Sequence, residues 1–186
     1  MKIGFVGSHG TGKTTLATLL AQDLKLPIIT GVMTKIWKEY KIEDFDRLSL
    51  KDRANFQIIA LSKQILLQED NASGFVTDRS VLDMLAYTLY LDCLEPSILD
   101  IYKKQVELIC KDYDFIFYLP IAFEFENRNL RASEESQIKV DKIIQSILPT
   151  KAIKVLGDSL AERLAEVKYT VALKELVSYS HARRFL

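Results

Sequence analysis

The feature that most constrains this chain is a glycine-rich stretch close to its N-terminus, residues 7–14, with the sequence GSHGTGKT. An apolar run, residues 3–6, precedes it, and residues 15–21 have the composition of a helix. This order predicts a buried strand, a glycine loop and a helix. Glycines in the loop let backbone N–H groups point inward, because no Cβ blocks a close approach or an unusual φ/ψ. The helix N-terminus adds free N–H groups and a partial positive charge, so the stretch predicts an anion cradle.

The spacing of this loop matches G-x4-G-K-[ST], the P-loop or Walker A motif. In that motif Lys13 reaches the β- and γ-phosphates of a nucleotide, and the Thr14 hydroxyl binds Mg²⁺. His9 lies at a variable position, and we expect it to act as a spacer rather than as a catalytic group. The residues expected to bind the nucleotide are Gly7, Ser8, His9, Gly10, Thr11, Gly12, Lys13, Thr14 and Thr15.

Length and charge narrow the class of protein. The 186 residues are enough for a full hydrophobic core, and we expect a single domain over residues 1–186. The 25 basic and 25 acidic residues balance, so composition predicts no general attraction to nucleic acid or to an anionic membrane. The two cysteines, Cys93 and Cys110, fit buried reduced thiols better than a disulfide framework. A core strand expected from residue 2 leaves no room for a signal peptide, and no apolar run has the length of a membrane span, so we expect a cytoplasmic protein.

Beyond the loop, strand-like and helix-like segments alternate along the whole chain. Further apolar runs predict buried strands over residues 26–30, 75–77, 115–120 and 152–156. Helical patterns cover residues 49–70, 81–90, 96–111 and 133–149, followed by a helix from residue 160 and a last helix ending near residue 181. The helix over 49–70 is expected to bury Phe56, Ile59, Ile65 and Leu66. The alternation predicts an α/β three-layer fold, with a parallel sheet between helices and ligands at the carboxyl ends of the strands.

A P-loop does not specify the reaction, so the class rests on the residues after the third predicted strand. A GTPase should carry an Asn-Lys-x-Asp loop, and no Asn-Lys pair occurs in the chain. Motor-type and AAA-type ATPases usually end this strand in two acidic residues, whereas here Asp78 is followed by Arg79. A cation in place of the water-activating carboxylate favours binding of a second anion or an acceptor over hydrolysis. The alternatives are that Asp78 caps the next helix and that Arg79 forms a surface ion pair; Asp83, about one turn further on, is expected to be structural.

Asp78-Arg79-Ser80 resembles the Asp-Arg or Glu-Arg-Ser segment of nucleoside and nucleotide kinases. Residues 77–87, 119–131, 157–159 and 162–164 are similar to P-loop kinases related to ribosylnicotinamide kinase domains. The resemblance implies the strand order 2-3-1-4-5, a small helical lid over residues 121–148, and ATP as the nucleotide. It further implies phosphorylation of a small nucleoside or nucleoside monophosphate. In such kinases the acidic residue lies near metal and acceptor, the arginine grips phosphate, and a loop like 157–159 borders adenine.

The resemblance also implies a catalytic role for two arginines in the lid. Arg128 and Arg131 fall where such a kinase delivers positive charge to the transferring phosphoryl group, with solvated ion pairs as the alternative. The chain departs from the resemblance at its second strand, where Thr30 stands in place of an acidic general base. That departure leaves Asp78 as the base, or removes the need for one. The expected catalytic set is Lys13, Asp78, Arg128 and Arg131, with Arg79 on the acceptor and with Thr14 and Asp78 at the metal.

Two other functions remain open at this point. One is a regulatory ATPase that changes shape for a protein partner. The other is a kinase that acts on a hydroxyl within a polynucleotide, which the balanced charge disfavours. Trp37 and Tyr40, spaced as on a helix, belong either to the core or to a surface that stacks on an acceptor base. Local basic patches could come from Lys35, Lys38, Lys41, Arg183 and Arg184.

Overall fold

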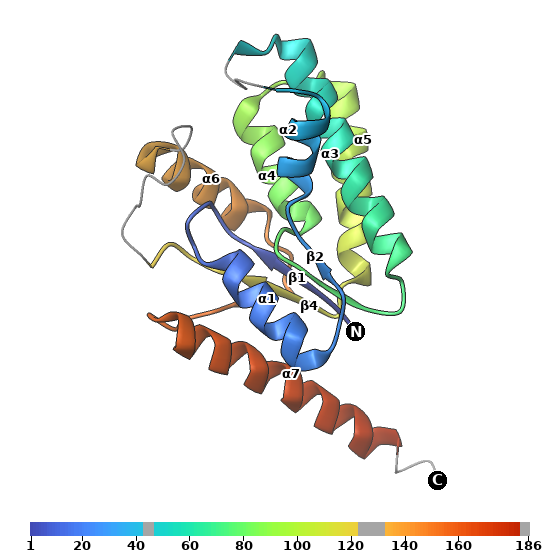
Figure 1. The fold of residues 1–186 in the computed structure, drawn as a ribbon, viewed down its shortest axis with the longest axis vertical. Helices are drawn as coiled ribbons and strands as arrows, with labels where there is room; N and C mark the ends of the chain where they lie inside the picture. The colour runs from blue at the N-terminus through green and yellow to red at the C-terminus, as the bar shows by residue number, and fades with distance from the viewer. Residues whose placement is uncertain (43–46, 123–132, 183–186) are drawn as a thin grey trace.

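The computed structural model describes residues 1–42, 47–122 and 133–182. Its centre is a five-stranded parallel sheet in the order β2-β3-β1-β4-β5 (Figure 1). The strands are β1 (Lys2–Val6), β2 (Ile28–Ile29), β3 (Phe75–Thr77), β4 (Phe115–Tyr118) and β5 (Ile153–Lys154). The predicted α/β class, the parallel sheet and the strand order are confirmed.

Strand β1 lies in the middle of the sheet and is paired along both edges. Gly4 lies opposite Thr77 of β3, and Val6 lies opposite Tyr118 of β4. Because all strands are parallel, their carboxyl ends share one edge of the sheet. The glycine loop after Val6 and Asp78 after β3 therefore leave neighbouring strands at the same edge.

Helices cover both faces of the sheet. One core joins Phe5 of β1 to Leu16 and Val167, and the other joins Val6 to Phe56 and to the remaining helices. Figure 1 shows α1 and α7 on one side of the sheet and α3, α4 and α5 on the other. In the described part of the chain, no helix is both long enough and apolar enough to cross a membrane. The helices are α1 (Lys13–Leu24), α2 (Val32–Glu39), α3 (Leu50–Asp70), α4 (Val81–Leu91), α5 (Pro96–Asp112), α6 (Glu134–Ile147) and α7 (Leu160–Ala182).

Two predictions of element length were wrong. Residues 160–182 form one helix instead of two, because neither glycine nor proline interrupts them. The strands predicted over 26–30 and 152–156 shrink to the two-residue β2 and β5. Both lie at edges of the sheet, where backbone pairing comes from one side only.

The buried face of α3 also differs from the predicted apolar stripe. Phe56 is buried as expected, but Leu66 is 57% exposed, whereas Gln64 is fully buried. The Gln64 side-chain amide donates to Thr77 Oγ1 at 3.0 Å and to the carbonyl oxygen of Arg79 at 3.1 Å. These acceptors at the end of β3 bind the side-chain amide nitrogen of Gln64, at a position where a polar side chain stands in place of the expected apolar one.

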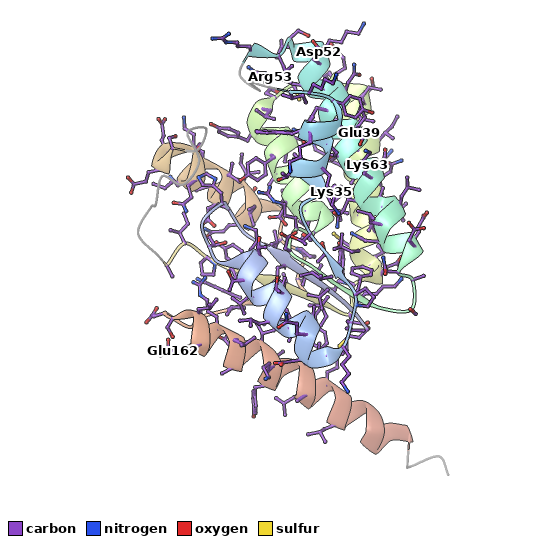
Figure 2. All side chains as sticks on the ribbon, in the orientation of Figure 1. Lys35, Glu39, Asp52, Arg53, Lys63 and Glu162 are labelled. Carbon is purple, nitrogen blue, oxygen red and sulfur yellow. The ribbon has the colours of Figure 1, made fainter. Side chains whose placement is uncertain are left out.

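On its exposed side, α3 is tied to α2 by an ion pair. Lys63 of α3 and Glu39 of α2 form this pair, and Figure 2 shows the two side chains between their helices. Both side chains are partly exposed, so we assign the pair little stability. The packing of α2 on α3 depends instead on Ile36 and Phe56, which are buried in the same core.

Candidate functional site

The backbone of the glycine loop requires glycine at three places. Gly10 and Gly12 have φ values of 76° and 84°, in the left-handed region that residues with a side chain rarely adopt. At Gly7 a Cβ atom would lie 2.6 Å from the carbonyl oxygen of Leu119, which is too close for any real contact. The loop therefore has the tight curvature that the motif predicts for a phosphate cradle.

Lys13 opens α1 and folds back over the loop. Its Nζ donates to the carbonyl oxygen of Ser8 at 2.5 Å and lies 3.4 Å from Thr11 Oγ1. The side chain is buried, and burial lowers the pKa of Lys13 to about 8, although the Asp83 carboxylate opposes this shift. The ammonium group of Lys13 therefore loses its proton at a lower pH than an exposed lysine does. A bound anion would raise this pKa again.

The carboxylate of Asp78 joins the glycine loop to the ends of two strands. Its Oδ2 accepts hydrogen bonds from Thr14 Oγ1 at 2.9 Å and from Thr30 Oγ1 at 2.6 Å. Thr14 belongs to the loop motif, and Thr30 follows β2. The two residues that the sequence predicts at a metal, Thr14 and Asp78, are therefore in direct contact.

The helix cap that was an alternative role for Asp78 belongs to other residues. Ser80 is the N-cap of α4, and its Oγ accepts from the N–H of Leu82 at 3.2 Å. Asp83 completes the capping box, because its Oδ2 accepts from the N–H of Ser80 at 2.9 Å. The other oxygen of Asp83 accepts from the N–H of Gly7 at 3.2 Å. Asp83 is thus structural, as predicted, and it also fixes the start of the glycine loop.

Asp83 is fully buried, and that burial sets its acidity. Burial raises the pKa of Asp83 to about 6, while Lys13, Arg79 and the two backbone N–H groups it accepts from oppose the rise. A carboxyl group with this pKa is ionised at neutral pH and protonated in mild acid. Its charge balances that of Lys13 beneath the loop.

Arg79 and His9 meet at the ring of Tyr87. The Arg79 guanidinium carbon lies 5.4 Å from the centroid of that ring, and the Tyr87 hydroxyl lies 3.3 Å from His9 Nδ1. The backbone carbonyl of His9 accepts from Gln137 Nε2 of α6 at 2.6 Å. His9 therefore spaces the loop against α4 and α6, which agrees with its predicted role, and Arg79 is half-buried against Tyr87.

The loop also fits the cofactors that the motif predicts. Ser8 Oγ is buried and has no hydrogen-bond partner among the described residues, so it is available to a phosphate oxygen. The Thr14 hydroxyl and the Asp78 carboxylate are the oxygen donors that Mg²⁺ prefers, since Mg²⁺ combines few protein ligands with phosphates and waters. In the described residues, no group of three or more His, Cys, Asp or Glu side chains is placed to hold a metal. The donor set present thus suits a metal that is shared with a nucleotide.

Four other residues were predicted at or near the site. Arg128 and Arg131 lie outside the described residues, so their predicted role stays a prediction. Trp37 packs on Phe56, with 6.3 Å between ring centroids, and so belongs with the core. Tyr40 is 51% exposed. The structure therefore brings together the P-loop residues, Asp78 and Arg79.

Comparison with known proteins places the chain in a family. A family model described as "AAA domain" matches residues 2–163. The chain belongs to this family. A search of curated protein sequences found no match. Family membership covers the whole span from β1 to the first turn of α7.

Solved structures with a similar fold include two that are named as kinases. Deoxyadenosine kinase from M. mycoides, with bound dATP, has a TM-score of 0.66 and 17% identity, covering 92% of this chain and 100% of that one. Thymidylate kinase from Ehrlichia chaffeensis has a TM-score of 0.63 and 18% identity, covering 91% and 98%. The NadR protein in complex with NR has a TM-score of 0.66 and 18% identity, covering 89% of this chain and 48% of that one. At these identities the likeness shows a P-loop kinase-like fold.

Three contacts of the site were missed from the sequence. Thr30 was noted for the acid that it replaces, but its bond to Asp78 was not foreseen. The bond of Asp83 to Gly7 and that of Gln137 to His9 join residues 76 and 128 positions apart. A capping-box spacing at Ser80 and Asp83 was the only local signal among them.

Proposed function

We propose that this protein is a Mg²⁺- and ATP-dependent phosphotransferase that acts on a small nucleoside or nucleoside monophosphate. The observation that carries the proposal is the hydrogen bond between Thr14 and Asp78, with Arg79 as the next residue. It places a P-loop hydroxyl, a carboxylate and a cation at neighbouring strand ends. A second carboxylate to activate water is replaced by Arg79, which favours an anionic or polar acceptor over hydrolysis.

The donor side of the reaction falls to the glycine loop. The N–H groups of the loop and of the first turn of α1 would bind the phosphates, and Lys13 would turn its ammonium group from the Ser8 carbonyl towards them. Thr14 and Asp78 would hold Mg²⁺, which neutralises charge on the phosphates when it is bound. Asp83 accepts from the N–H of Gly7, and its negative charge favours the protonated form of Lys13.

The acceptor side falls to the residues around the end of β3. Asp78 is the one carboxylate proposed to approach the acceptor hydroxyl, and Thr30 shares its Oδ2 atom. Arg79, supported by Tyr87, is proposed to hold the acceptor. Arg128 and Arg131 are proposed to stabilise the transferring phosphoryl group from a lid over residues 121–148. The names of the two kinases of similar fold, deoxyadenosine kinase and thymidylate kinase, support acceptors of nucleoside size.

The direct test follows ADP release against a panel of acceptors. The panel contains deoxynucleosides, ribonucleosides, ribosylnicotinamide and nucleoside monophosphates, each with and without EDTA. We expect ADP to appear only with Mg²⁺ and with particular acceptors, together with a phosphorylated product. In the Lys13→Ala variant the activation barrier should rise by several kcal/mol, which lowers turnover roughly a thousandfold or more. Circular dichroism should show that this variant is folded.

A second candidate is a regulatory ATPase, which the AAA-domain family match favours. Such a protein would release ADP at the same rate whether or not any acceptor is present. That outcome would contradict the phosphotransferase proposal, and retention of a protein partner with ATP but not with ADP would then support the switch.

A further inference from the structure

One buried arginine of α7 contacts three separate loops at the nucleotide edge of the sheet. Arg163 is fully buried, and its Nε donates to the carbonyl oxygen of Gly157 at 2.7 Å. Its Nη1 donates to the carbonyl oxygen of Thr11 at 3.0 Å, and its Nη2 donates to that of Pro120 at 3.0 Å. Figure 2 labels Glu162, the preceding residue, at the N-terminal end of α7. A single guanidinium thus joins the glycine loop, the end of β4 and the turn after β5.

The contact with Thr11 determines how the glycine loop presents its backbone. The carbonyl and N–H groups of a trans peptide point in opposite directions. With the Thr11 oxygen held towards Arg163, the N–H of Gly12 points away from Arg163. Gly12 is the N-cap of α1, so Arg163 sets the direction of a donor group at the start of the anion cradle.

The placement of Arg163 is costly for the fold by itself. A cation in the first turn of a helix lies near the positive end of the helix dipole, where it is unfavourable. Burial lowers the pKa of the guanidinium, and Asp158 and Glu166 only partly oppose that shift. Charge-assisted hydrogen bonds from Arg163 to the three carbonyls offset this cost. A neutral apolar side chain could not make these bonds.

The contact with Gly157 is as close as the backbone permits. A Cβ at Gly157 would lie 2.7 Å from the backbone nitrogen of Arg163 and 2.8 Å from the Cβ of Glu162. Glu166 accepts from the N–H of Gly157 at 3.1 Å, which holds the same turn against α7 from the other side. The turn after β5 is therefore fixed to α7, and through Arg163 to the glycine loop.

We infer that Arg163 is a positioning residue for the nucleotide: it fixes the glycine loop and the 157–159 turn relative to one another, so that one nucleotide contacts both. This inference rests on the proposed function, because it assumes that the loop binds the phosphates of ATP and that the turn borders the base. In this inference Arg163 acts on the nucleotide through the loop and the turn, and not by contact with the phosphates or the base.

The test compares the binding of ATP with that of tripolyphosphate, which has no base. Calorimetry at a temperature well below the melting point of each variant gives the two dissociation constants. Arg163→Met should weaken both ligands about tenfold or more, since a charge-assisted hydrogen bond to each loop is lost. Lys168→Met is the matched control, because Lys168 of the same helix pairs with Asp23 on the exposed surface at 2.6 Å. It should leave both constants unchanged.

Two more variants separate the two halves of the inference. Gly157→Ala moves the turn and removes no group from the glycine loop. It should therefore weaken the binding of ATP and leave the binding of tripolyphosphate unchanged. Arg163→Lys keeps the charge but places its donors on one nitrogen, so its affinity should lie between those of wild type and Arg163→Met. If Arg163→Met does not fold, Arg163→Lys takes its place in the comparison of the two ligands.

The outcomes distinguish this inference from the proposed function. If Arg163→Met and Arg163→Lys lower the melting temperature but bind both ligands like wild type, Arg163 is only structural and the inference is wrong. If Gly157→Ala binds ATP like wild type, the inference that the 157–159 turn contacts the base of the bound nucleotide is wrong. If wild type binds ATP but phosphorylates no acceptor, the phosphotransferase proposal fails while the binding comparison still decides the role of Arg163. If wild type binds neither ligand, both are overturned.

Discussion

Two properties of Lys13 should make its change in protonation on nucleotide binding measurable. Its ammonium group is buried beside the Ser8 carbonyl, and its pKa is lowered from 10.5 to about 8. The charged groups that act on it are Asp83, Arg79, Asp78 and Asp141. A phosphate placed against Lys13 adds an opposite charge, which raises the pKa of the bound form. Binding of a nucleotide should therefore draw a proton onto Lys13 at pH values where the free protein has partly lost it.

The first prediction concerns the pH dependence of ATP binding. Below about pH 7 Lys13 is protonated in the free and bound protein, so affinity should not depend on this group; above about pH 8 affinity should fall. Near pH 8.5, calorimetry in two buffers of different ionisation enthalpy should show uptake of a fraction of one proton. The Lys13→Arg variant stays charged throughout this range and should show no such uptake. Equal uptake by the two proteins would contradict the assignment to Lys13.

At the scale of elements, the capping box of α4 connects two parts of the fold. Asp83 satisfies the N–H of Ser80 at the start of α4 and the N–H of Gly7 at the start of the glycine loop. A second capping box, Ser133 with Ser136 at the start of α6, has the same pattern but is exposed. The two boxes allow the effect of a buried charge to be separated from that of a cap.

The second prediction follows from the raised pKa of Asp83. The folded-state pKa of about 6 exceeds the ordinary value of 3.8, so the folded state binds the extra proton between these values. The stability contributed by that proton is complete below about pH 4 and is lost as the pH rises through about 6. The free energy of unfolding of wild type relative to Asp83→Asn should therefore fall by up to about 3 kcal/mol between pH 4 and pH 7.

Urea unfolding at several pH values measures this difference. Ser133→Ala is the control, and it should cost about 1 kcal/mol at every pH, because its cap carries no buried charge. A difference between wild type and Asp83→Asn that stays constant with pH would show that Asp83 does not titrate in this range.

The elements themselves could largely be predicted from the sequence. Apolar runs located β1, β3 and β4, because strands covered on both faces need apolar residues on both sides. The short edge strands were predicted too long, since hydropathy does not tell where backbone pairing stops. Gln64 faces the core through its bonds to Thr77 and Arg79, and no periodicity of apolar residues could place it.

The site could be predicted only where its geometry is local. The P-loop spacing specified Lys13 and Thr14, and the strand end specified Asp78. Partners such as Thr30 and Arg163 reach the site from distant parts of the chain, so their contacts depend on the strand order and helix packing. A single sequence contains no signal for such pairs.

For the molecule as a whole, the glycine loop is joined to both helical layers. Asp83 of α4 and Gln137 of α6 bind it from the layer on one face of the sheet. Arg163 of α7 binds it from the layer on the other face, where α1 also packs. Because these hydrogen bonds from both layers converge on one loop, unfolding of either layer should disrupt the conformation of the glycine loop. The single domain over residues 1–186 stays a prediction, and these contacts give the reason to test it.

The last prediction tests that unity by calorimetry. The chain should unfold in one transition whose calorimetric and van't Hoff enthalpies agree. ATP with Mg²⁺ at a free concentration about 100 times its dissociation constant should stabilise the whole folded state by about 2.7 kcal/mol and move the entire transition upward. In Lys13→Ala the transition should stay single but move little, because the phosphates lose their cation. Two transitions, of which only one responds to ATP, would show that α3 to α5 unfold apart from the nucleotide site. That result would mean that the capping box of Asp83 does not couple the layers, and it would divide the predicted domain in two.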